Sequence, residues 1–94
     1  MIGIIATMKI KEGTNKKFEE VASRLQGAVT KNEPGVVYYD WYKGKDDTTY
    51  VVLERYKSQD DLDAHGQTEY MKTIGGEMGQ YMAGRPEVTI LKSI

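Results

Sequence analysis

The hydrophobic residues of this chain change their spacing several times, and the order of these changes constrains the fold more than any other feature. Residues 3–10 (GIIATMKI) alternate between two sets of positions, as the residues of a β-strand do. From Asn15 to about Lys31 apolar residues recur every three or four positions, which predicts an amphipathic helix with one buried face made of Phe18, Val21, Ala22, Leu25 and Val29. Pro34 and Gly35 then end the helical pattern.

The rest of the chain predicts two strands in a hairpin, two helices and a final strand. The predicted ranges are 36–43 and 49–57 for the hairpin, 59–65 and 69–84 for the helices, and 85–94 for the last strand. Thr14, Ser58 and Thr68 are the predicted helix N-caps, because their hydroxyl groups can accept from free amides of the first turn. Gly75, Gly76 and Gly79 predict that the second of these helices, 69–84, is loose or closely approached by another segment.

This order of elements, β-α-β-β-α-β, predicts one α+β domain over residues 1–94 with a ferredoxin-like arrangement. Helices would cover one face of a four-stranded antiparallel sheet, and a monomer should leave the other face polar. In the hairpin strands both faces carry large side chains instead. We therefore expect a homodimer joined through the open face of the sheet.

Composition narrows the expected partners and cofactors. The formal net charge is −1 and the basic residues are scattered, so no nucleic-acid partner is expected. No apolar run approaches the roughly 20 residues of a membrane span, and the N-terminal segment lacks the pattern of a signal peptide. With no cysteine and one histidine, thiolate chemistry is excluded and metal binding is disfavoured. We expect a cytoplasmic protein without a bound metal or other cofactor.

Three polar residues are candidates for a functional site. His65 is the only histidine and suits a general base at neutral pH, although a histidine at a helix end also simply complements the helix dipole. Glu54 lies among apolar strand residues, so it must either hydrogen-bond a tyrosine or a helix amide, or have a raised pKa. Asn32 either ends the first helix or orients a ligand.

The aromatic residues of segment 36–43 include the only tryptophan of the chain. Large rings fill a core well, but alternation along a strand sends them to two faces. We expect Tyr39 and Trp41 to face a pocket, where they would stack on a flat ligand, and Tyr38 and Tyr42 to face a partner.

Three segments, NEPGVVYYDWY (32–42), TYVVLERYKSQDDLDAH (49–65) and TEYMKTIGGEM (68–78), resemble the antibiotic biosynthesis monooxygenase (ABM) domain. Its relatives include small quinol oxygenases and autoinducer-2-processing proteins, and the resemblance covers nearly the whole chain in the right order. It implies a dimeric α+β barrel and oxygen chemistry on a small aromatic or quinol-type substrate without metal, flavin or haem. Tyr70 stands where many relatives have a second histidine, so a mechanism with two imidazoles is not expected.

The resemblance also implies functional residues. Asn32, Tyr39, Glu54, Tyr56 and His65 match family positions. Together with the residue patterns, this gives His65, Glu54 and Asn32 as catalytic candidates, and as substrate-binding candidates Tyr39, Trp41, Tyr50, Tyr56 and Tyr70.

Two functions remain open from the sequence. The first is a cofactor-independent monooxygenase in which His65 removes a proton from an electron-rich substrate that then reacts with O₂. The second is a non-catalytic small-molecule-binding dimer, or an isomerase related to autoinducer-2 processing, that uses the same pocket without oxygen. Oxygen uptake distinguishes the two.

Overall fold

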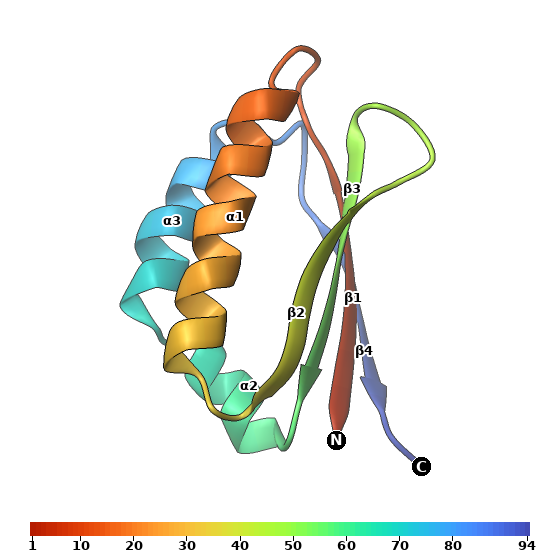
Figure 1. Ribbon diagram of the computed structural model, residues 1–94. Helices are drawn as coiled ribbons and strands as arrows, with labels where there is room; N and C mark the ends of the chain where they lie inside the picture. The colour runs from red at the N-terminus through yellow and green to blue at the C-terminus, as the bar shows by residue number, and fades with distance from the viewer.

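A four-stranded antiparallel sheet forms one layer of the computed structural model, and helices form the other (Figure 1). The structure describes residues 1–94. Along the chain the elements are β1 (Ile2–Lys9), α1 (Asn15–Asn32), β2 (Val36–Lys43), β3 (Thr49–Tyr56), α2 (Gln59–Gly66), α3 (Glu69–Gly79) and β4 (Glu87–Lys92). The predicted ferredoxin-like α+β fold is confirmed.

The strand order in the sheet is β2-β3-β1-β4, so β1 and β3 are central and β2 and β4 form the edges. All neighbours are antiparallel. The pairing of β2 with β3 shifts register between Val36 and Tyr38, where one extra residue forms a β-bulge. Beyond the bulge, Tyr39 lies opposite Glu54 and Trp41 opposite Val52. These pairs therefore share the face that the helices cover.

The core lies between this face and α1. All five apolar residues predicted for the helix stripe are buried, and Phe18 and Val29 are completely inaccessible to solvent. The sheet contributes the side chains of alternate residues of β1 and β3. In β3 this alternation buries a carboxylate, Glu54, together with Val52 and Tyr56.

The helix caps agree with the predictions at two of three positions. The hydroxyls of Ser58 and Thr68 accept from the amides of Asp61 and Met71. Thr14 occupies the N-cap position of α1, but its hydroxyl donates to the carbonyl of Lys11 instead of accepting from the helix. The predicted capping bond of Thr14 is therefore wrong.

The last helix and the last strand are shorter than predicted. α3 ends at Gly79 because the next residues bond to the end of β1: the carbonyl of Tyr81 accepts from Lys11 N, and the amide of Ala83 donates to Lys9 O. A Cβ added at any of the three α3 glycines would have no contact within 4 Å, so no segment approaches them closely. The prediction that another segment closely approaches these glycines is therefore wrong.

Apolar side chains are exposed on both faces of the sheet. The face without helices carries Ile5, Tyr38, Tyr42 and Leu91 as large exposed hydrophobic residues. On the helix side, Ile90 of β4 is also exposed, since the helices do not extend over this edge strand. None of the helices is long and apolar enough to cross a membrane.

The burial pattern of α1 predicts opposite effects for two neighbouring positions. Replacing Phe18 with Ala should lower the free energy of unfolding by about 3–5 kcal/mol, because it opens a cavity in the core. Replacing the exposed Lys17 with Ala should change it by about 0.5 kcal/mol or less. Urea unfolding followed by circular dichroism measures both, and equal effects would contradict the packing described here.

Candidate functional site

A cavity of about 320 Å³, the inner cavity, lies between the sheet and the helices. Its wall is mostly apolar and includes Leu25, Met71 and Met78. Glu54 and His65 are the only acid and the only base in this wall. Tyr39 and Trp41 also line it, so the structure brings together four of the residues predicted for the site from β2, β3 and α2.

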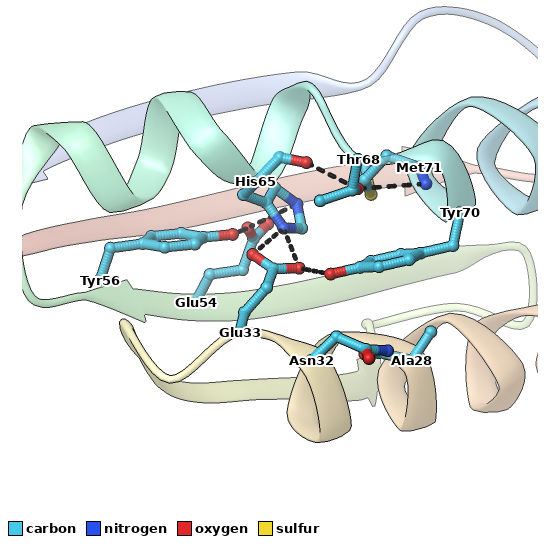
Figure 2. A network of polar contacts seen from close by, with 9 residues as sticks. All are labelled: Ala28, Asn32, Glu33, Glu54, Tyr56, His65, Thr68, Tyr70 and Met71. Carbon is cyan, nitrogen blue, oxygen red and sulfur yellow. Dashed lines mark hydrogen bonds and ion pairs between the residues drawn. The ribbon is translucent and has the colours of Figure 1, made fainter.

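His65, in the last turn of α2, is buried and held from several sides (Figure 2). Its Nδ1 atom lies 2.9 Å from Oε1 and 3.1 Å from Oε2 of Glu33. The rings of Tyr39 and Tyr56 pack beside the imidazole, with centroid distances of 5.6 and 5.3 Å. The hydroxyl of Thr68 donates to the His65 carbonyl at 2.9 Å, which joins the end of α2 to the start of α3.

Glu33 is the centre of this network, and it was not among the residues predicted for the site. It follows the last residue of α1, and the hydroxyl of Tyr70 donates to its Oε2 atom. Burial, and then the contact with Glu33, raise the pKa of Tyr70 to about 12, so this hydroxyl stays protonated at neutral pH. Glu33 belongs to the NEPG segment (32–35) that resembles the family, but only Asn32 of this segment was predicted as a site residue.

Glu54 faces the inner cavity. It both accepts a hydrogen bond from a tyrosine and has a raised pKa, which the sequence predicted as alternatives. The hydroxyl of Tyr56 donates to its Oε1 atom at 2.5 Å, and Nε2 of His65 lies 4.0 Å from the same oxygen. Burial raises the pKa of this carboxyl, and the hydrogen bond from Tyr56 and the electrostatic interaction with His65 only partly oppose that effect. Burial and the neighbouring Glu54 also raise the pKa values of Tyr39 and Tyr56, which therefore remain neutral donors.

The indole N–H group of Trp41 has no hydrogen-bond acceptor within the protein. Its indole ring meets Phe18 and Tyr39 edge to face at 5.7 and 6.2 Å. The Nε1 atom is buried and has no hydrogen-bond partner. A buried donor without an acceptor typically costs about 1–3 kcal/mol, so an oxygen atom of a ligand beside Trp41 would relieve this cost.

The other predicted residues lie outside the wall of the inner cavity. Asn32 is exposed, and its side chain donates to the carbonyl of Ala28 at 2.8 Å, away from His65 (Figure 2). Tyr56 is fully buried and holds Glu54 instead of lining the cavity. Tyr50 donates to Glu19 and lines a different cavity of about 240 Å³.

Tyr70 lines the outer pocket, a hollow of about 470 Å³ at the surface, together with Asn32 and Glu33. Gly35 lies in the same wall and determines how closely α2 approaches this turn. A Cβ at position 35 would lie 2.2 Å from Cγ of Asp61, in α2, so only glycine allows this contact. Asp61 lies in the first turn of α2, and His65, one turn further along the same helix, lies next to Glu33.

These groups form an acid and a base in a mostly apolar cavity, which is a setting for proton transfer. The structure contains no group of three or more His, Asp and Glu side chains arranged to hold a metal ion. The hydrophobic wall and aromatic rings suit a flat, uncharged ligand.

Comparison with known proteins identifies relatives of this chain. The family model described as antibiotic biosynthesis monooxygenase matches residues 1–75. Among curated proteins, none matches the chain. A solved structure of a protein from Caulobacter crescentus CB15, which carries the same name provisionally, is 39% identical in sequence to this chain. The comparison covers 99% of this chain and 89% of that chain, and its TM-score is 0.95.

Two further solved structures have the same fold. A protein from Nitrosomonas europaea with the same provisional name is 27% identical, with coverage of 100% and 99% and a TM-score of 0.87. Rv0793 from Mycobacterium tuberculosis is 22% identical, with coverage of 99% and 94% and a TM-score of 0.88, and this likeness concerns the fold alone.

Replacing Glu54 with Gln should remove a pH dependence of stability. Because the pKa of Glu54 is raised from its ordinary value of 4.5, the folded state binds this proton more tightly than the unfolded state. The stabilising contribution of this group is complete below that value and is lost as the pH rises through the folded-state pKa. The free energy of unfolding of the variant, relative to wild type, should therefore increase with pH, by about 1.4 kcal/mol per unit of pKa shift.

Urea unfolding at a series of pH values between about 4 and 8 measures this difference. The control is Glu20→Gln, which changes an exposed glutamate of α1 and should parallel the wild type. Parallel curves for Glu54→Gln and the wild type would contradict the raised pKa.

Proposed function

The chain belongs to the antibiotic biosynthesis monooxygenase family, and we propose that it oxidises a small aromatic or quinol-type substrate with O₂ and without a bound cofactor. The family match and the related structures support a monooxygenase-like, oxidoreductase function. The observation that carries the proposal is the inner cavity, in which Glu54 and His65 face Tyr39 and Trp41 in an otherwise apolar wall.

The size of the inner cavity favours a small substrate. Its volume of about 320 Å³ is near the lower end of the roughly 300–1,000 Å³ of ligand pockets. A flat molecule with one to a few fused rings would stack against the rings of Tyr39 and Trp41. An oxygen substituent of the substrate would accept from the unpaired Nε1–H group of Trp41.

An aromatic substrate that carries an activated CH₂ group can supply all the electrons that the reaction with O₂ needs, so no other reductant is required. His65 removes one C–H proton, and the carbanion gives one electron to O₂. The substrate radical and superoxide combine to form a C–O bond, and His65 returns its proton to the peroxide anion. Loss of the second C–H proton then breaks the O–O bond, so the carbon becomes a carbonyl and the other oxygen leaves as water. The apolar wall would exclude bulk water from the carbanion.

A second function uses the same groups without oxygen. An acid and a base that face one ligand also suit an isomerase that moves a proton between two carbon atoms. This function, and that of a non-catalytic binding protein, predict ligand binding without oxygen consumption. Trp41 would report such binding through its fluorescence, because it lines the inner cavity.

We further propose that the chain forms a homodimer through the sheet face without helices. Ile5, Tyr38, Tyr42 and Leu91 are between 39% and 51% exposed on this face. An apolar surface across several strands is typical of an interface. Pairing of two copies by a two-fold axis would bury the same residues on each.

Replacing His65 with Ala should lower turnover by about 10²-fold or more, because it removes the proposed base. Oxygen uptake is measured with a panel of quinols and anthrone-like compounds, and thermal melts check the fold. Gln67→Ala, an exposed change just after α2, is the control and should retain activity. Normal turnover by the His65 variant would rule out its catalytic role, and ligand binding without oxygen uptake by the wild type would favour the second function.

Replacing Ile5 with Lys should convert the dimer to a monomer, because it places a charge in the centre of the proposed interface. Sedimentation velocity at micromolar concentration measures the change. The matched control is Ile90→Lys, at an exposed apolar residue on the helix side of β4. A wild-type protein that is monomeric at this concentration would contradict the proposal.

A further inference from the structure

The two ring nitrogens of His65 face different parts of the molecule. Nδ1 lies 2.9 and 3.1 Å from the two oxygens of Glu33, which lines the outer pocket. Nε2 is 4.0 Å from Oε1 of Glu54, which lines the inner cavity. The imidazole therefore stands between the outer pocket and the inner cavity, with one carboxyl group on each side (Figure 2).

We propose that Glu33 and Tyr70 are positioning residues that hold His65 as the neutral tautomer with its proton on Nδ1. The unprotonated Nε2 atom then faces the inner cavity and is the atom that takes the substrate proton. This inference rests on the proposed function, because it takes His65 to be the base. It adds which nitrogen acts and which residues select it.

The hydrogen-bonding capacity of Glu33 supports this tautomer. An ionised carboxylate only accepts, so a ring nitrogen within hydrogen-bond distance of both its oxygens must be the donor. Tyr70 donates to Oε2 of the same carboxylate, which then accepts from two donors and is held in one orientation. A proton on Nδ1 of a neutral imidazole leaves the lone pair on Nε2.

No other group competes with Glu33 at hydrogen-bond distance. Tyr39 and Tyr56 contact the imidazole through their rings, and Thr68 bonds to the backbone carbonyl of His65. Glu54 is the alternative acceptor, on the other side of the ring. Without the Glu33 carboxylate, the imidazole would be free to donate an Nε2–H group toward Glu54, and the inner cavity would then lose its base.

The tautomer can be observed directly because His65 is the only histidine. Two-bond ¹H–¹⁵N correlation spectra of ¹⁵N-labelled protein at neutral pH should show a protonated Nδ1 and an unprotonated, pyridine-type Nε2. In Glu33→Gln the Nε2–H form should become populated, whereas Glu33→Asp, which keeps the charge, should retain mainly the Nδ1–H form. The control is Glu69→Gln, an exposed change in the same outer pocket, whose spectrum should match the wild type.

Turnover provides the second measurement. Glu33→Gln should lower kcat about 10–100-fold with little change in KM, and Glu33→Asp should recover part of the loss. Tyr70→Phe keeps the ring but removes the donor, so it should give a smaller loss of kcat in the same direction. Thermal melts identify any variant that fails to fold, and the wild-type spectrum alone still tests the tautomer.

The two proposals fail in different ways. A wild-type spectrum with the proton on Nε2, or a tautomer unchanged in both Glu33→Gln and Tyr70→Phe, overturns the positioning role even if the enzyme is active. Absence of turnover with every substrate overturns the proposed function, while the spectra still decide which nitrogen of His65 carries the proton. A protonated Nδ1 that depends on Glu33, with the matching loss of kcat, supports both.

Discussion

The site depends on one carboxylate that joins three parts of the chain. Glu33, at the end of α1, accepts hydrogen bonds from His65 of α2 and Tyr70 of α3. Glu33 is more than 30 positions from both His65 and Tyr70 along the chain, so these contacts exist only when the helices have packed onto the sheet. The absence of a side chain at Gly35 allows α2 to lie close enough for this contact. Backbone packing and site geometry are therefore set by the same short turn.

The second constraint is the burial of a carboxyl group in a central strand. Leaving Glu54 charged in an apolar wall is costly, and the protein reduces this cost by raising the pKa of the group and by a hydrogen bond from Tyr56. The side chain of Glu33 is nearly as buried, but it lines the outer pocket and contacts both His65 and Tyr70 by hydrogen bonds. Two acids on either side of one imidazole thus have different surroundings, which is a common way for enzymes to give similar groups different roles.

Local patterns in the sequence predicted the elements well but not their long-range contacts. The stripe from Phe18 to Val29 identified α1, and alternation placed the hairpin strands, because these signals arise from burial against a sheet or a core. The end of α3 was missed because residues 81–83 bond to β1, which helical periodicity does not reveal. For the same reason the sequence did not predict the hydrogen bond from Tyr50 to Glu19. It also did not predict that Glu33, next to Asn32, contacts His65. His65, Glu54, Tyr39 and Trp41 do line one cavity, since β2 pairs with β3 and α2 directly follows β3.

The β-bulge between Val36 and Tyr38 gives the edge strand a further property. One extra residue there reverses which side every later residue of β2 faces. If the same sequence paired with β3 without this bulge, Tyr38 would lie opposite Glu54 and Asp40 opposite Val52. In the wall of the inner cavity one tyrosine would then replace another, and an acid would replace Trp41. The bulge therefore decides which side chains of β2 a ligand in the inner cavity meets, although the strand lies at the edge of the sheet.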